Sequence, residues 1–239
     1  MLLYLIYLFL ALFPIALFFS VVYVSDIHEP EPLKYLIITF LLGVLITPAV
    51  LYIGDILKAY TGASVDSPPL LLFVYAMGIV ACTEEGLKFL MLRLYSYPHD
   101  EFDEPYDGIM YAVSISLGFA AVENILYTFN QGVHTAVWRM ITAIPLHVIC
   151  GVIMGYYAGK AKFTVSRMKA TLLLAQGLVF AILFHGFYDY FLFIEQWISL
   201  SILSIIMIIW GIQFINYAME AHVAISPHAT DNEDLPPVE

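Results

Sequence analysis

Long apolar runs separated by short polar stretches set the pattern of this chain. Seven runs, bounded by charged residues or by proline and glycine, are long enough as helices to cross a hydrocarbon core of about 30 Å. We expect Pro14 and Pro48 to kink the first two helices without ending them. The pattern predicts an all-α fold, a polytopic transmembrane helix bundle of about seven spans. The expected spans are 2–24, 33–54, 69–95, 108–130, 134–159, 170–194 and 197–219.

The composition supports this assignment to the membrane. Of the 239 residues, 62% are hydrophobic and 12% are charged, whereas a soluble domain carries about twice that charged fraction. We assign residues 1–225 to one transmembrane domain surrounded by the lipid bilayer, and the acidic residues 226–239 to a disordered tail. The net charge of −11 argues against a nucleic-acid partner. Cys82 and Cys150 both lie in apolar runs, which excludes a disulfide framework.

The lysines and arginines indicate how the chain is oriented. With Lys88 set aside as buried, six basic residues fall on one side of the membrane and two on the other. Because basic residues gather on the cytoplasmic side, we expect a cell-membrane protein whose N-terminus lies outside and whose C-terminus is cytoplasmic. Arg139 lies near a span end, where snorkelling of its side chain accounts for the charge. The six are Lys34, Arg93, Lys160, Lys162, Arg167 and Lys169, and the two are Lys58 and Arg139.

The third run carries three charged residues at membrane depth. Glu84, Glu85 and Lys88 interrupt an otherwise apolar segment, and each such charge near a helix centre costs about 2.5–3.5 kcal/mol on insertion scales. At about 100° per residue, Lys88 lies between the two glutamates on one helix face. A structural ion pair between helices is one explanation, but one lysine cannot neutralise two glutamates. The excess negative charge therefore indicates a function.

The next three spans add polar side chains at a similar depth. A helix with one polar stripe faces a bundle interior rather than lipid, so we expect these side chains to converge. Gly151 and Gly155 in the fifth span also predict close helix packing. The polar residues are Glu123 and Asn124 in the fourth span, His147 in the fifth, and His185 and Asp189, one helical turn apart, in the sixth.

These spans hold more carboxylates than bases. Four carboxylates and one lysine leave three negative charges if all are ionised, and a dry interior does not hold that charge. Either some carboxylates keep their protons or a cation is bound. The first alternative suits a metal-free site with a glutamate as general base for water. The second suits one divalent metal, Zn²⁺ foremost, held by Glu123, His147 and His185. Both alternatives lead to hydrolysis.

Four short patterns follow one another on successive spans over residues 84–189. They are Glu84-Glu85-x-x-Lys88, Phe119-x-x-x-Glu123-Asn124, His147 with Gly155 eight residues on, and His185-x-x-x-Asp189. In this order they resemble the PrsW family of intramembrane proteases. The related CAAX-protease and bacteriocin-processing proteases share the paired glutamates, but Lys88 and Glu123 stand where that wider group has an arginine, one position later, and a histidine.

The resemblance implies proteolysis of membrane-anchored proteins or peptides, such as an anti-sigma factor at the start of regulated proteolysis. It also implies roles for the polar residues of these spans. Glu84 or Glu85 would be the general base, tuned by Lys88. His147 and His185 would orient the water, bind a metal or stabilise the oxyanion, with Asn124 as a hydrogen-bond donor and Asp189 as the residue that orients a histidine.

Other classes of membrane protein have a weaker basis in the sequence. There is no HExxH motif of a site-2-type zinc protease and no Gly-x-Ser-Gly of a rhomboid protease. Tyr52 stands where a GxGD aspartyl protease needs a glycine before Gly54-Asp55. A proton- or cation-coupled transporter also places charged residues at the midplane, but the small size and the lack of an internal repeat argue against it. A non-catalytic scaffold is the third alternative.

Overall fold

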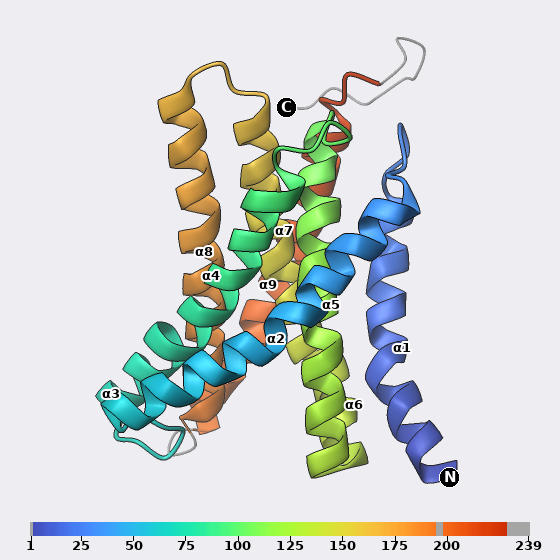
Figure 1. The fold of residues 1–239 in the computed structure, drawn as a ribbon. Helices are drawn as coiled ribbons and strands as arrows, with labels where there is room; N and C mark the ends of the chain where they lie inside the picture. The colour runs from blue at the N-terminus through green and yellow to red at the C-terminus, as the bar shows by residue number, and fades with distance from the viewer. Residues whose placement is uncertain (1, 195–197, 229–239) are drawn as a thin grey trace.

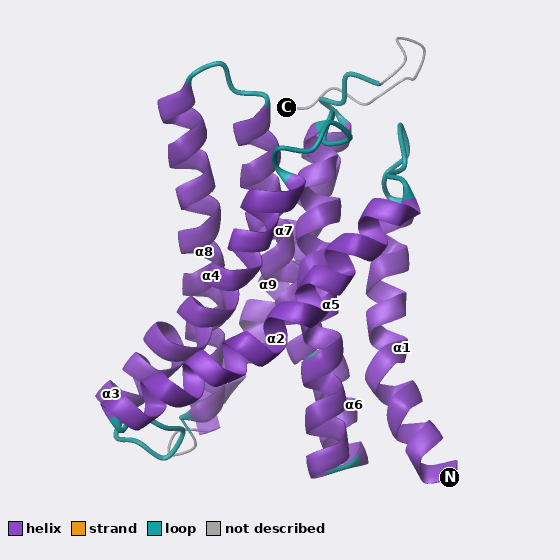
Figure 2. Cartoon of the chain, viewed as in Figure 1, coloured by secondary structure: helices purple, strands orange, loops and turns teal. Residues whose placement is uncertain are grey.

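The computed structural model describes residues 2–194 and 198–228, and every regular element in these ranges is a helix (Figures 1 and 2). Most helices run roughly parallel or antiparallel to one another, and α2 crosses the bundle obliquely. The elements are α1 (Leu2–Val24), α2 (Leu33–Thr61), α3 (Pro69–Phe73), the π-helical η1 (Val74–Ala81), α4 (Cys82–Met91), the π-helical η2 (Leu92–Ser96), α5 (Pro105–Gln131), α6 (Val133–Ile141), α7 (Ala143–Lys162), α8 (Arg167–Phe193) and α9 (Ile198–Val223).

Seven helical segments within the described ranges are long and apolar enough to cross a membrane, which confirms the predicted bundle. Two of them are composite. The third span, Pro69–Ser96, runs through α3, η1, α4 and η2, and the fifth, Val133–Lys162, joins α6 to α7. The fifth span breaks at Thr142, whose φ and ψ are −126° and −71°. Pro145 explains this break, because its ring would collide with the carbonyl of Ile141 in a continuous helix.

The helix α2 continues past residue 54, where the apolar pattern predicted its end. Asp55 pairs with Lys58 less than one turn further on, at 3.0 Å, so the polar segment remains helical. The helix ends at Gly62, which has a φ of +69° and donates its N–H to the carbonyl of Lys58 at 2.8 Å. Pro14 and Pro48 both lie inside uninterrupted helices, as predicted.

The centre of the bundle is formed by α5 and α7. Their spans are 78% and 67% buried, the highest fractions among the seven. Glycines allow these backbones to approach closely: a side chain at Gly155 would collide with the carbonyl of Gly108, and one at Gly118 with the carbonyl of Phe40 on α2. At Gly151 an added Cβ would meet α5 at 3.0 Å. The close packing predicted for the fifth span is therefore confirmed.

After α9 the chain turns back onto the end of the bundle that is uppermost in Figure 1. The Ser226 hydroxyl donates to the carboxylate of Glu104, and the His228 ring lies 2.8 Å from Glu29 and 3.4 Å from Asp103. The first three residues of the predicted tail, 226–228, thus contact the helical domain. Residues 229–239 lie outside the described ranges.

Candidate active site

Three charged side chains of α4 form the base of the site. Glu84, Glu85 and Lys88 are 6%, 0% and 1% exposed, directly after the wide helical turns of η1. Lys88 Nζ lies 2.8 Å from Glu85 Oε1 and 3.3 Å from Glu84 Oε2, so the lysine lies between the two glutamates as predicted. The ammonium is also 4.1 Å from the centroid of the Phe119 ring, a favourable cation–π contact. Such π-helical turns occur frequently at functional sites.

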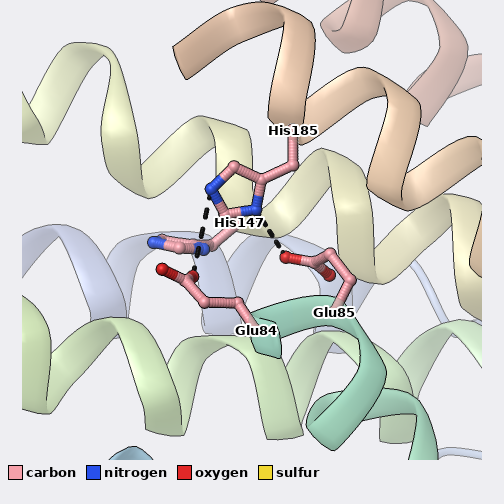
Figure 3. Close-up of side chains that lie close together, drawn as sticks. All are labelled: Glu84, Glu85, His147 and His185. Atoms are coloured by element: carbon pink, nitrogen blue, oxygen red, sulfur yellow. Dashed lines mark hydrogen bonds and ion pairs between the residues drawn. The ribbon is translucent and has the colours of Figure 1, made fainter. Parts of the chain in front are cut away.

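His185 on α8 faces the same two glutamates (Figure 3). Its Nδ1 lies 2.7 Å from Glu85 Oε1, and its Nε2 lies 3.4 Å from Asp189 Oδ2 and 3.9 Å from Glu84 Oε2. The predicted pairing of His185 with Asp189 along one helix is therefore confirmed. Three carboxylates surround this imidazole, and together they hold its ring in one orientation.

His147 on α7 connects the lysine to Glu123 of α5. Lys88 Nζ lies 3.1 Å from Nδ1 of His147, and Glu123 Oε2 lies 3.0 Å from Nε2. Because an ammonium can only donate, Nδ1 accepts its proton and the Nε2–H donates to Glu123. The centroids of the His147 and His185 rings are 5.5 Å apart. Side chains from four consecutive spans thus meet in one cluster, as their similar depth predicted.

Arg139 is the residue of the site that the sequence analysis missed. Instead of snorkelling outward, its Nη2 lies 2.7 Å from Glu123 Oε2 and its Nε donates to Asn124 Oδ1 at 3.0 Å. The guanidinium also lies 4.2 Å from the centroid of the Tyr127 ring. Asn124 in turn donates from Nδ2 to the carbonyl of Ala11 on α1, at 2.9 Å. Asn124 is thus fixed to α1 through its Nδ2 and holds Arg139 through its Oδ1.

The sequence did contain a signal for the inward position of Arg139. Gly132, with a φ of +86°, directly precedes the short helix α6, and Pro145 follows the end of α6 by four residues, in the first turn of α7. A glycine and a proline at this spacing indicate a separate short helix rather than the first turns of a long one. A short helix that folds back beside α5 can direct an arginine towards the bundle interior.

Four residues of the cluster could share one metal ion. The ligand atoms offered by Glu84, Glu85, His147 and His185 all lie within 4.8 Å of one another, and all four residues are buried (Figure 3). Oε2 of Glu85 is buried and has no hydrogen-bond partner. Glu123, predicted as a ligand beside the two histidines, is not one of these four; its carboxylate contacts His147 and Arg139 instead.

A cavity of about 290 Å³ leads to this cluster. Its wall includes Glu84, His147 and His185, together with Arg139, whereas Glu85 and Lys88 do not line it. Other parts of the wall come from Lys58 near the end of α2 and Gln131 at the end of α5. The cavity therefore connects the cluster with the end of the bundle where α2 and α5 terminate, and it makes Glu84 the more accessible of the paired glutamates.

The charges of the site do not balance. With Arg139 included and both histidines neutral, as metal ligands must be, the two permanent cations face four carboxylates, so two negative charges remain instead of the three expected from the sequence. One divalent cation or two protons would neutralise this remainder. The four carboxylates are Glu84, Glu85, Glu123 and Asp189, and the two permanent cations are Lys88 and Arg139.

Comparison with known proteins gives a consistent family. Residues 31–214 match the family described as "PrsW family intramembrane metalloprotease". "Protease PrsW" of Geobacillus kaustophilus (strain HTA426) is 42% identical over 179 residues, which cover 74% of this chain and 76% of the relative. "Protease PrsW" of Bacillus subtilis (strain 168) is 35% identical over 192 residues, 80% of this chain and 85% of the relative. "Protease PrsW" of Clostridioides difficile (strain 630) is 31% identical over 208 residues, 85% and 86% of the two chains. No solved structure gives a significant match.

Proposed function

Because the chain belongs to the PrsW family of intramembrane proteases, we propose that its buried glutamate–histidine cluster cleaves membrane-anchored proteins in a metal-dependent reaction. The observation that carries this proposal is the group formed by Glu84, Glu85, His147 and His185, whose ligand atoms lie within 4.8 Å of one another and of which all but Glu85 line a cavity. Family membership also favours proteolysis over coupled transport or a scaffold role as the use of these charges.

The donor set fits a zinc ion. Two imidazoles and a carboxylate form a common catalytic zinc set, and Glu85 offers a buried oxygen that no hydrogen bond satisfies. The two unmatched negative charges of the site equal the charge of one divalent cation. His147, His185 and Glu85 would hold the ion once the Lys88 ammonium no longer occupies Nδ1 of His147, and the ion would supply Lewis acidity towards water and the scissile carbonyl.

The residues of the chain then have distinct roles. Glu84 faces the cavity and is placed to accept a proton from the attacking water, as a general base must be within reach of its substrate. Glu123 and Asp189 orient His147 and His185 through the hydrogen-bonding and ion-pair contacts described above. Arg139, which also lines the cavity, is placed to polarise the carbonyl oxygen of a bound peptide.

The substrate class follows from where the cluster lies. A substrate that spans the membrane as a helix keeps its peptide carbonyls in internal hydrogen bonds. Such a peptide bond can therefore be attacked at a buried site only where the substrate helix is locally extended. We therefore propose single-span proteins as substrates, with an anti-sigma factor as the example that the family resemblance implies. With the N-terminus outside and the C-terminus in the cytoplasm, the cavity faces the outer side, because its wall includes Lys58 near the end of α2.

Purified protein in detergent tests this function. A single-span substrate should be cut at one bond, and active protein should contain close to one zinc per chain. A strong chelator should abolish cleavage and added zinc should restore it. Cleavage by zinc-free protein that resists chelation would instead establish the metal-free glutamate mechanism, in which the excess charge is neutralised by protons.

A further inference from the structure

A second group of buried carboxylates lies at the other end of the bundle, away from the cavity. Asp26 and Glu31 come from the loop between α1 and α2, and Glu104 and Asp107 from the start of α5. Each of the four is at most 3% exposed. Oxygens of Asp26, Glu104 and Asp107 lie within 4.8 Å of one another, and the carboxyl group of Glu31 lies beside that of Asp107. We call these four residues the acidic cluster.

Helix capping accounts for part of this cluster but not for all of it. Glu104 and Asp107 form a reciprocal capping box, with the N–H of Glu104 donating to Asp107 Oδ2 at 2.7 Å. Negative charge at a helix N-terminus is favourable. Asp26 and Glu31 have no such role, because both belong to another segment of the chain.

Three of the four carboxylate oxygens of Asp26 and Glu31 lack hydrogen-bond partners. No hydrogen bond of normal geometry reaches either carboxylate oxygen of Asp26 or Oε1 of Glu31, although all three atoms are buried. Buried carboxylate oxygens without partners are costly, because they lose water and gain nothing in exchange. Three unsatisfied oxygens directed at further carboxylates therefore indicate that something positively charged belongs between them.

The protein itself does not supply that positive charge. No lysine or arginine in the described part of the chain forms an ion pair with the acidic cluster. Lys162 donates instead to the backbone carbonyls of Tyr97 and His99, at 2.8 and 3.1 Å. Burial, the larger cause, and repulsion from Glu104 raise the pKa of Asp26 to about 8. In the active site, by contrast, Lys88 and Arg139 contact the carboxylates directly.

The chemistry of the cluster specifies the kind of cation. All of its donors are oxygens, from four carboxylates with the Ser226 hydroxyl bound to Glu104. Hard cations take such oxygen sets, whereas zinc prefers nitrogen and sulfur. Glu29 and Asp103, which lie close to cluster residues in the chain, and His228, which contacts both, are exposed, so solvent reaches the rim of the cluster. We propose that the acidic cluster binds a hard divalent cation, Mg²⁺ or Ca²⁺, which ties the α1–α2 loop and the start of α5 to the segment that follows α9.

Full-length protein in detergent, stripped of metals and reloaded with zinc, provides the test. Terbium, which replaces hard cations, should bind one site per chain and emit on excitation of tyrosine, because Tyr111 donates to Glu31 at 2.6 Å. Whichever of CaCl₂ and MgCl₂ displaces terbium at the lower concentration identifies the preferred cation. At saturation that cation should raise the melting temperature by about 5–10 °C, as expected for a ligand at about one hundred times its dissociation constant.

Variants assign the effect to the cluster. Asp26→Asn should weaken terbium binding at least tenfold and remove the cation-dependent shift in melting temperature, with Glu31→Gln as the second variant if the first does not fold. Asp55→Asn, which changes an exposed carboxylate paired with Lys58, should leave both signals unchanged. The proposal is wrong if wild-type melting is independent of both cations, or if Asp26→Asn binds terbium as wild type does. Protons and capping would then account for the cluster.

Discussion

Two groups of four carboxylates lie inside the described part of the bundle, and they differ in what surrounds them. In the active site, Lys88, Arg139 and two histidines contact the carboxylates. In the acidic cluster the observed donors are hydroxyl groups and backbone N–H groups. The first group keeps two unmatched negative charges and the second keeps four if all are ionised. In the two proposals above a cation neutralises each remainder: the mixed nitrogen and oxygen donors of the first group suit zinc, and the oxygens of the second suit a hard ion.

This difference suggests a catalytic role for the first group and a structural role for the acidic cluster. Three of the four carboxylates of the first group, Glu84, Glu123 and Asp189, line a cavity, and the contacts of the group fix the histidines in one orientation. The acidic cluster joins the α1–α2 loop, the start of α5 and the segment after α9. Changes in the first group should therefore affect catalysis, and changes in the second should affect stability and its response to cations.

The largest expected effect is the loss of catalysis when Glu84 becomes glutamine. Glu84→Gln keeps the shape of the side chain but cannot accept a proton from water, so kcat should fall about 10²–10⁴-fold. Glu85→Gln should also impair cleavage, with a loss of bound zinc that Glu84→Gln does not show. Cleavage of a single-span substrate and metal content are measured on the same samples. Full activity in both variants would remove the paired glutamates from the mechanism.

The second prediction separates the two groups by their metals. His147→Ala and His185→Ala should lose zinc and proteolysis together, because each removes a ligand. Asp26→Asn should keep its zinc content and its cleavage activity at low temperature, where the fold is intact. Metal analysis of the three purified variants decides this. Loss of zinc from Asp26→Asn as well would show that the two groups are not independent.

The sequence predicted the glutamate–histidine cluster far better than it predicted the acidic cluster, for a physical reason. A charge within an apolar run, such as Glu84 or His147, is conspicuous because lipid does not solvate it. Asp26 and Glu104 lie in polar segments, where water normally solvates a carboxylate, and only the tertiary arrangement buries them. Arg139 was missed for a related reason: near a span end, its charge has an ordinary explanation.

The seven spans were predictable because a fixed bilayer thickness constrains helix length. The ends of the spans were less predictable, because α2, for example, continues to Thr61. The pairing of Asp55 with Lys58 keeps that segment helical where hydropathy stops being informative. The π-helical turns of η1, which precede Glu84, also leave no mark in hydropathy. Local backbone geometry of this kind depends on the packing of α4 against its neighbours.

The third prediction concerns the stability that Lys88 provides. Lys88→Met leaves Glu84 and Glu85 buried without their ammonium, and breaking a buried ion pair in this way costs about 3–5 kcal/mol. Melting in the absence of zinc should therefore fall by about 10 °C. Saturating zinc should recover much of this loss, because the ion binds the folded state and supplies the missing charge. Asp26→Asn should behave in the opposite way without added cations and melt at or above the wild-type temperature. If zinc has no effect on Lys88→Met, the charge balance of the active site does not involve a metal.

The smallest expected effect comes from Tyr111, which donates its hydroxyl to Glu31 Oε2 at 2.6 Å. Tyr111→Phe removes this donor and leaves a second Glu31 oxygen unsatisfied, at a cost of about 1–3 kcal/mol. A cation bound at the cluster would compensate, since Glu31 could give both oxygens to the ion. The melting temperature of Tyr111→Phe should therefore fall by a few degrees without added cations and approach that of wild type when Mg²⁺ or Ca²⁺ saturates the site. Tyr106→Phe is the matched control, because Tyr106 donates to the backbone carbonyl of Val22 and not to a carboxylate. Its loss of stability should be the same at every cation concentration, and an equal recovery in both variants would contradict a cation held by Glu31.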